Sequence, residues 1–544
     1  MKVITIPQEV AEIISKLQGA GFEAYAVGGC VRDLLLKELG LSHVEGPQDW
    51  DVTTSAKPEE IQTLFPGSFY ENKFFTVTVK TGSEDPVLKE VEVTTYRAEG
   101  RYTDKRHPDE VKPAKTLEED LSRRDFTINA IAIAIEETRD KRQETRNDMS
   151  SRILRDRMSL VDPFGGQKDL EQKIIRAVGN PEERFQEDAL RMMRAVRFAG
   201  RFDFTAEPKT RDAIRAHAGL LQAIAKERIR DELVKIIEDQ NAKRTLELMH
   251  DVGLLKYAFP ELEEGIGMDQ RGPHKYDVWE HNLRALDYAV SQNFSTRVRI
   301  AALLHDVGKA RTRVRRGGIW TFYGHDVVGA KMAYEILMRL RFSEKEAEVI
   351  ANLVRWHLFN YKLPTDEQYK KDLLAMGENP NQKDIEDSDA DVQETTDSAI
   401  RRLIRNVGAE HIHDLVQVRM CDRIATGVPK AVPYRLRHFQ FRVEKVLREG
   451  EATNVKMLAV KGGDVMERLA IPPGPRVGHI LNTLLEEVLD APEKNTREYL
   501  LKRVEELHKM SDEELAEMRK QAQERVQLLE EERVGEIKKK YYVK

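Results

Sequence analysis

Cysteine is scarce in this chain of 544 residues, which contains two, Cys30 and Cys421. Two thiols cannot build a disulfide framework, so we expect a reducing compartment. Long apolar runs are also missing: the longest, near residues 131–135, is far shorter than the roughly 20 residues that cross a membrane. The N-terminus lacks the pattern of a signal peptide. These absences predict a cytoplasmic protein without a membrane partner.

An excess of basic residues is missing as well. Lys and Arg number 88 and Asp and Glu 94, a formal net charge of −6, whereas nucleic-acid-binding proteins are usually basic. Residues 384–397 alone hold seven acidic residues and no basic one, and taking these away turns −6 into +1. Residues 191–201 and the C-terminal KKKYYVK are locally basic. An RNA partner requires a positive face rather than a positive total, so the net charge does not exclude one.

Two hydrophobic patterns divide the chain. Residues 1–135 combine helix-period apolar residues with alternating runs, such as FFTVTVK at 74–80 and KEVEVTTYR at 89–97, which predict strands. After about residue 165, strand patterns nearly vanish and amphipathic helical patterns follow one another. We therefore predict an α+β fold in which a small mixed-sheet head precedes a long all-α body. The charged residues 136–158 lie between the two parts, and we expect a solvated loop or helix there.

The head carries a glycine turn and three acidic residues. Gly28 and Gly29 follow an apolar strand and precede a helical stretch, a junction where backbone N–H groups can approach a phosphate. Asp49 and Asp51 are two apart, which on a strand places both carboxylates on one face and suits Mg²⁺. Glu92 lies between two valines and points away from the apolar face. A glycine turn alone is usually structural, and a lone Asp pair is usually a solvated strand end. Together they favour two-metal phosphoryl transfer.

A stripe of charged residues follows in the first helical stretch of the body. Asp188, Arg191, Arg194 and Arg197 are spaced i, i+3, i+6 and i+9, which places them along one side of a helix. The plain interpretation is an exposed intrahelical ladder of Asp–Arg pairs, worth a few tenths of a kcal/mol each.

Four motifs of the head occur in order: VGGCVRDLLL, DWDVTTSA, EVTTYRAEGRYTDKRHPDEV and LEEDLSRRDFTINAIAI. Further matching segments lie at 161–204, 227–233 and 461–492. Together they resemble the bacterial class II tRNA nucleotidyltransferase (CCA-adding) and poly(A) polymerase family, over about residues 20–260 and 455–505. The resemblance implies a polymerase-β-like head. We expect four domains: a head at 1–160, a helical neck at 161–265, an HD domain at 266–430 and a helical tRNA-binding tail at 431–544.

The resemblance also implies roles for the head residues. Asp49 and Asp51 would bind two Mg²⁺ ions, with Glu92 as the third catalytic carboxylate. The incoming nucleotide would be contacted by four residues of the head: Gly28, Gly29, Arg32 and Arg124. The plain alternative for Arg124 is a salt bridge to Asp120 or Asp125.

In the neck, the resemblance implies that protein side chains select the base. Asp188 would accept and Arg191 would donate hydrogen bonds to the Watson–Crick edge of cytosine or adenine, whereas guanine and uracil present the opposite order and would leave buried groups unpaired. Arg194 and Arg197 would lie near the phosphates or the RNA.

Histidine and aspartate recur in the body in the order H…HD…H…H…D. A lone histidine beside an apolar helix is usually structural, but this order resembles the HD superfamily of metal-dependent phosphohydrolases, with Lys309 at that family's usual spacing. The resemblance implies four ligands of a metal ion: His281, His305, Asp306 and Asp422. Such a ligand set suits a transition metal more than Ca²⁺. His325 and His357 are candidates for a second metal or a phosphate.

Four arginines follow the HD pair: Arg311, Arg313, Arg315 and Arg316. They are candidates to attract a phosphate end, and a solvated basic loop is the plain alternative.

The function that the resemblance implies is addition of CCA to tRNA 3′ ends from CTP and ATP, with release of pyrophosphate. A-only addition, CC-only addition and polyadenylation keep the same chemistry, and the intact loop at 97–111 argues against CC-only addition. From other classes, we keep an HD-type phosphohydrolase acting on RNA 3′-phosphates or 2′,3′-cyclic phosphates, and a non-catalytic RNA-binding protein, which the retained Asp pair disfavours. A homodimer is left open.

The chain departs from the family pattern in its loops. Family members often have glycine before the threonine of the strand at 74–80, where this chain has Phe75. The stretch between Arg32 and Asp49 is extended, and the inserts at 136–158 and 384–397 have no role that the sequence assigns.

Overall fold

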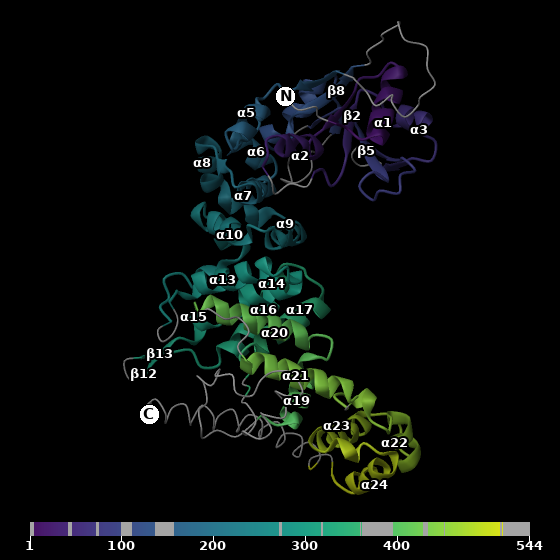
Figure 1. Cartoon of the computed structure of the whole chain (residues 1–544), viewed down its shortest axis with the longest axis vertical. Coiled ribbons are helices and arrows are strands. Elements are labelled where there is room, and N and C mark those ends of the chain that lie inside the picture. The colour runs from purple at the N-terminus through teal and green to yellow at the C-terminus, as the bar shows by residue number, and fades with distance from the viewer. Residues whose placement is uncertain are drawn as a thin grey trace. The chain divides into compact units, whose positions relative to one another are not determined.

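The computed structural model of the chain divides into two compact units, Met1–Glu263 and Glu264–Lys544 (Figure 1). It describes residues 5–41, 46–71, 75–99, 111–136, 157–270, 275–316, 319–359, 361, 395–427, 434–450, 452–511 and 514. Within these residues, no helix combines the length and the apolar character that a membrane crossing needs. Most of the loop expected at 97–111, of the insert at 384–397 and of the basic C-terminus lies outside the described residues.

The first unit is built on a mixed sheet of seven strands in the order β3-β4-β5-β2-β1-β8-β9. Alternation of apolar and polar residues explains why the central segments form strands. In β5 the valines at 91 and 93 are fully buried, and the intervening Glu92 is exposed. β2 and β5 run parallel, and the other neighbouring pairs run antiparallel. The strands are β3 (Phe69–Glu71), β4 (Thr76–Lys80), β5 (Glu90–Thr95), β2 (Asp51–Thr54), β1 (Ala24–Val27), β8 (Ala132–Glu136) and β9 (Arg157–Val161).

Helices and short strands complete the head. The helices are α1 (Gln8–Gly19), α2 (Gly29–Glu38), α3 (Pro58–Leu64), α4 (Leu117–Ser122) and α5 (Gly166–Glu171). Two small strand pairs are β6 (Arg97–Glu99) with β7 (Val111–Pro113), and β10 (Ile174–Ile175) with β11 (Thr205–Ala206). β8 and β9 pair as far as Glu136 and Arg157. The ends of the charged segment predicted as a loop or helix at 136–158 therefore belong to strands.

The neck of the first unit is helical, as predicted. Its helices are α6 (Pro181–Glu187), α7 (Leu190–Phe202), α8 (Pro208–His217), α9 (Lys226–Glu238), α10 (Ala242–Asp251), α11 (Leu255–Ala258) and α12 (Pro260–Glu263). Close packing of α7 on α10 depends on Gly200, where a Cβ atom would lie 1.9 Å from Thr245 Oγ1.

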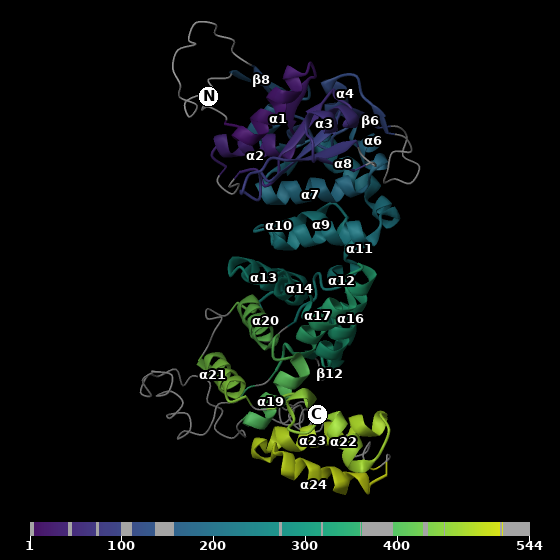
Figure 2. The same ribbon diagram turned by 90° about the vertical axis from the view of Figure 1, so that its right-hand side faces the viewer.

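The second unit consists of helices and one hairpin among the described residues (Figure 2). Its first helices are α13 (Val278–Ser291), α14 (Thr296–Leu304), α15 (Lys309–Thr312), α16 (His325–Arg339) and α17 (Glu344–Trp356), followed by α19 (Asp397–Val407), α20 (Ile412–Ala425) and α21 (Tyr434–Arg448). The hairpin joins β12 (Val314–Arg316) to β13 (Ile319–Thr321). Three last helices, α22 (Gly462–Leu469), α23 (Pro475–Asp490) and α24 (Arg497–His508), enclose an apolar cluster of their own. The predicted α+β fold is confirmed, but the body is not all-α as predicted, because it contains β11 and the hairpin β12–β13.

Candidate functional site

The glycine turn of the head packs directly on the residues predicted to surround a nucleotide. Gly28 has φ +86°, and a Cβ atom there would lie 2.6 Å from Arg124 Nη1 and 3.5 Å from Asp51 Oδ2. A Cβ atom at Gly29 would lie 3.9 Å from Asp49 Oδ1. Both the left-handed backbone and this close approach require glycine at position 28. The turn therefore brings Asp49, Asp51 and Arg124 to the start of α2.

The three carboxylates lie at or just before β2 and on the neighbouring strand β5. Asp51 opens β2 and lies in register with Glu92 on the parallel strand β5. Asp49 is exposed and precedes β2, so the expectation that both aspartates lie on one strand is wrong. Their ligand oxygens, with that of Glu92, do not all lie within 4.8 Å of one another. The site is an open group of carboxylates rather than a closed cage.

Electrostatics at this edge favour a cation. Burial, together with the charges of Asp49 and Glu92, raises the pKa of Asp51 to about 6, although Arg124 opposes the shift. Carboxylates that repel one another in this way are stabilised by a divalent cation between them. The donor set consists of oxygen atoms, which fits Mg²⁺.

Arg124 and Arg32 are held by contacts with neighbouring side chains. Arg124 lies 3.9 Å from Asp120, so the salt bridge considered as its plain alternative is present. Arg32 is buried, donates to Asp33 and Asn129 at 2.7 Å each, and has its guanidinium 5.0 and 5.1 Å from the rings of Phe198 and Phe202 on α7. Arg32 thus joins α2 to the neck. Its Nη2 also lies 3.7 Å from the Cβ position of Gly29.

The charged stripe of the neck differs from the predicted exposed ladder. Asp188 ends α6 in an extended conformation, so it does not share a helix with the three arginines. Arg191 and Arg197 are only 9% and 6% exposed. Packing of the neck against the head and α9 buries this face, which the spacing along one helix could not reveal.

The partners of the stripe come mainly from other elements. Arg228 on α9 donates twice to Asp188, at 3.1 and 2.7 Å. Arg194 pairs with Asp125 at 2.9 Å, and Arg197 with Glu232 at 2.5 Å. Arg191 pairs with Glu187 at 2.7 Å and donates to the Arg123 carbonyl at 3.2 Å. Burial opposes ionisation of Asp125, but Arg194 lowers its pKa to about 2. Sequence reasoning missed Arg228 and Glu232, although both lie in the matching segment 227–233.

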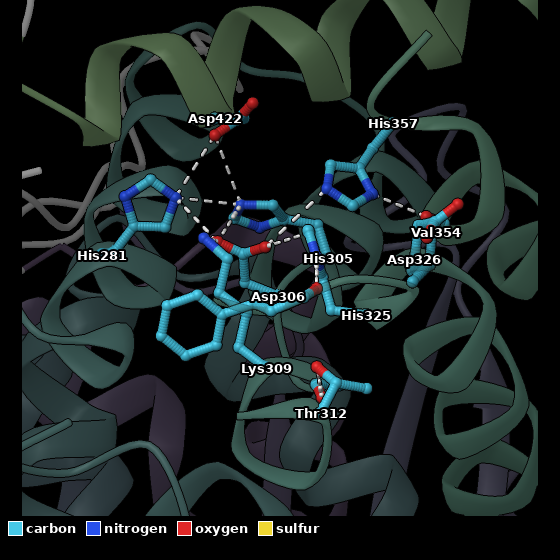
Figure 3. A network of polar contacts seen from close by, with 12 residues as sticks. His281, His305, Asp306, Lys309, Thr312, His325, Asp326, Val354, His357 and Asp422 are labelled. Atoms are coloured by element: carbon cyan, nitrogen blue, oxygen red, sulfur yellow. Dashed lines mark hydrogen bonds and ion pairs between the residues drawn. The ribbon is translucent and has the colours of Figure 1, made fainter. Parts of the chain in front are cut away.

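The four predicted ligands of the HD site converge in the second unit (Figure 3). His281 on α13 and His305 after α14 approach to 3.0 Å between their Nε2 atoms. His281 Nε2 lies 3.2 Å from Asp306 Oδ2 and 3.3 Å from Asp422 Oδ1. All four residues are buried, and one ligand atom of each lies within 4.8 Å of the others. Asp306, His325 and His357 form a second such group.

Hydrogen bonds to the far side of the rings orient these histidines. The Nδ1 atoms of His305, His325 and His357 lie 2.7, 2.7 and 2.6 Å from backbone carbonyl oxygens. An imidazole held this way directs Nε2 at the cluster, as a metal ligand requires. The buried Nε2 atoms of His325 and His357 make no hydrogen bond in the described structure. Both Nε2 atoms face Asp306 Oδ1, at 3.3 and 3.7 Å, and this set of nitrogen and oxygen donors fits a transition metal.

The HD cluster is strongly charged. Burial opposes protonation of His305, but Asp306 raises its pKa to about 10, whereas burial lowers the pKa of His357 to about 3. Lys309 lies 2.5 Å from Asp306 and donates to Gln270 at 2.6 Å. Sequence reasoning missed Gln270, because no motif marks it.

Family models match three parts of the chain: the poly A polymerase head domain at residues 24–176, the probable RNA and SrmB-binding site of polymerase A at 203–266, and the HD domain at 278–397. A head with a carboxylate edge and a glycine turn, followed by a helical neck and a histidine–aspartate cluster, defines a nucleotidyltransferase with an appended HD domain.

Similar proteins show which nucleotidyltransferases this chain is related to. The A-adding tRNA nucleotidyltransferase of Deinococcus radiodurans is 34% identical over 382 residues, 68% of this chain and 75% of that protein. The CCA-adding enzyme of Limosilactobacillus reuteri is 31% identical over 519 residues, 94% of this chain and 100% of that protein. The crystal structure of Bacillus stearothermophilus CCA-adding enzyme in complex with CTP is 28% identical, with a TM-score of 0.57, and the match covers 92% of this chain and 97% of that one. The chain belongs to the tRNA nucleotidyltransferase and poly(A) polymerase family.

Proposed function

We propose that this protein adds CCA to tRNA 3′ ends from CTP and ATP and releases pyrophosphate. The observation that carries the proposal is the packing of the Gly28 turn on Asp51 and Arg124, with Glu92 in register beside Asp51. The proposal is supported by the similarity to the CCA-adding enzyme of Limosilactobacillus reuteri, because the match covers the full length of that enzyme.

In this proposal the head holds the reacting groups. Asp49, Asp51 and Glu92 hold Mg²⁺, which would supply a lowered pKa for the RNA 3′-hydroxyl and charge stabilisation for the triphosphate. The backbone N–H groups at the start of α2 bind a phosphate. Arg124, which faces Gly28, orients the triphosphate by its positive charge.

The neck selects the base. Asp188, fixed by the two hydrogen bonds from Arg228, accepts from the exocyclic amino group of cytosine or adenine. Arg191, held by Glu187, donates to the neighbouring ring nitrogen. Guanine and uracil would place like groups opposite these side chains, and such unpaired buried groups are rejected strongly. Arg194 and Arg197 already have acidic partners, and their expected place near the phosphates or the RNA stays a prediction.

The test uses tRNA that ends at the discriminator base, in C or in CC, with each nucleotide alone and in combination. With both nucleotides present, we expect two C residues and one A to be added to the tRNA that ends at the discriminator base. The variant Asp49→Ala should add nothing to any of the three ends. Absence of addition to every end in the presence of Mg²⁺ would refute the proposal.

A-only addition is a second candidate, because the similar protein from Deinococcus radiodurans is named as an A-adding enzyme. The same assay separates the candidates: an A-adding enzyme extends only the tRNA that ends in CC and does not use CTP. Polyadenylation would appear as a ladder of A residues without a stop.

An HD-type phosphohydrolase activity is a second function of the same chain. It is favoured by the convergence of His281, His305, Asp306 and Asp422 around one point. These residues would hold a divalent transition metal, which would supply an activated water for attack on a phosphate ester.

The proposal for the whole protein also includes tRNA as its partner, a cytoplasmic location, and domain boundaries at residues 160, 265 and 430. A homodimer stays a prediction.

A further inference from the structure

The hairpin β12–β13 is tied to the HD cluster at both of its ends. Before it, Lys309 contacts Asp306 at 2.5 Å. After it, His325 Nδ1 lies 2.7 Å from the Phe322 carbonyl oxygen, and His325 Nε2 lies 3.3 Å from Asp306. Close backbone packing joins these ends, since a Cβ atom at Gly308 would lie 2.2 Å from the His325 carbonyl oxygen. The position of the hairpin is therefore fixed relative to the cluster.

One face of the hairpin combines arginine with an aromatic ring. Arg315 lies directly opposite Trp320 in the antiparallel register, and Arg313 is two residues away on the same face. The guanidinium of Arg313 lies 3.9 Å from the centroid of Trp320, and that of Arg315 lies 5.8 Å from it. Within the described residues, neither arginine has an acidic partner, and Arg313 Nε makes no hydrogen bond. Figure 1 draws the hairpin at the margin of the helices, next to α15.

Exposed apolar side chains are neighbours in sequence of two histidines of the cluster. Tyr323 and Val327 flank His325 in the sequence and are 42% and 50% exposed, and Leu358 follows His357 and is 42% exposed. Val314 on β12 is 48% exposed, but it pairs with Thr321 and lies on the opposite face of the hairpin from Arg315 and Trp320.

We propose that this surface, made of Arg313, Arg315, Trp320 and Tyr323, binds the last nucleotides of a single-stranded RNA and presents its 3′-phosphate to the HD cluster. Aromatic rings stack on bases and arginines neutralise the backbone, which is how proteins hold single strands without reading sequence. Because neither arginine has an acidic partner among the described residues, their charges favour a polyanion over a protein partner. The inference rests on the proposed phosphohydrolase activity. In that reaction water attacks phosphorus, the bond to the 3′-oxygen breaks, and the products are a 3′-hydroxyl and inorganic phosphate.

The test compares the full-length protein with the double variant Arg315→Ala/Trp320→Ala. The matched control, Lys331→Ala/Arg448→Ala, removes two exposed charges outside the hairpin. Each protein, loaded with Mn²⁺ or Ni²⁺, is given a six-nucleotide RNA with a 3′-phosphate, and separately p-nitrophenyl phosphate. We expect the hairpin variant to raise KM for the RNA by about tenfold, in line with the loss of one stacked base. Its kcat on the small ester, and all constants of the control, should match the unaltered protein.

A second readout does not depend on hydrolysis. The same RNA carries 4-thiouridine as its last nucleoside, and the cross-linked peptides are identified by mass spectrometry. We expect cross-links to the peptide that contains Trp320, and their loss in the hairpin variant. If neither ester is hydrolysed but these cross-links form, the phosphohydrolase proposal fails and the binding surface stands. Equal KM values for the RNA in all three proteins, or cross-links confined to the first unit, would overturn the inference.

Discussion

The two candidate metal sites of this chain differ in almost every physical property. In the head, Asp49 is exposed, the ligands offer oxygen only, and the three carboxylates are spread beyond 4.8 Å. In the HD domain, His281, His305, Asp306 and Asp422 are buried and converge within that distance. An open oxygen site suits an ion that arrives with a substrate triphosphate, whereas a buried site with nitrogen ligands holds its ion without substrate. Our proposal thus assigns two kinds of metal chemistry to one chain, and matched substitutions can separate them.

The largest expected effect is that of Asp51→Asn. It preserves the shape of the side chain but removes the charge that lies beside Gly28 and Glu92. We expect nucleotide addition to fall by at least about 10²–10³-fold, the usual loss when one electrostatic group is removed from an active site. Single-turnover rates of tRNA extension measure this loss. Metal bound by the HD cluster should be unchanged, and a parallel loss of both would contradict two separate sites.

Asp306→Asn is the matched change in the HD domain. Asp306 contacts Lys309 and the imidazole rings of His281 and His305, so its carboxylate is buried among polar partners. Removing one partner of such a buried group costs about 3 kcal/mol or more. We expect loss of the transition metal, measured by elemental analysis, and a lower Tm for the protein. Retention of metal at the original stoichiometry would show that Asp306 is not a ligand.

Asp188→Ala tests selection of the base rather than catalysis. Without its acceptor, the pair with Arg191 no longer distinguishes an amino group from a carbonyl on the base. We expect the preference for CTP and ATP over UTP and GTP to fall by about 100-fold, within the range that lost hydrogen-bond recognition produces. The ratio of kcat/KM values measures it. Arg228→Lys, which keeps the charge but not the two-pronged contact, should give a smaller change in the same direction.

The smallest effect is a pH dependence confined to the head. The pKa of Asp51 is raised to about 6, so the carboxylate is ionised above this pH and protonated below it. Protons then compete with Mg²⁺ for the same oxygen atoms. At limiting Mg²⁺, we expect the rate of addition to fall about tenfold per pH unit below pH 6. Saturating Mg²⁺ should move the inflection to lower pH, and an inflection that does not respond to Mg²⁺ would assign it to another group.

Sequence patterns predicted local structure well and long-range partners poorly. Val91 and Val93 alternate with Glu92, so the orientation of that carboxylate could be predicted from the strand alone. The spacing of Asp188 fits the helix that carries the three arginines, yet this residue ends α6. Its partner Arg228 lies 40 residues further along the chain. The burial of Arg32 between α2 and the rings of α7 is equally invisible in a linear pattern.

One departure from the family pattern has a physical counterpart in the backbone. Phe75, which stands where the family resemblance implies glycine, has φ +55°. This left-handed conformation costs a residue with a Cβ atom about 1–2 kcal/mol, which explains why glycine is favoured there. The resemblance alone identified the position, and the dihedral angle supplies the reason.

The most direct test of two separate chemistries is tRNA extension at single-nucleotide resolution by Asp51→Asn and Asp306→Asn, assayed side by side below the Tm of each. The substrate ends at the discriminator base, and CTP, ATP and Mg²⁺ are supplied. We predict that Asp306→Asn adds C, C and A and then stops, while Asp51→Asn adds nothing. Extension by Asp51→Asn at the unaltered rate, or its loss in a folded Asp306→Asn protein, would contradict the account.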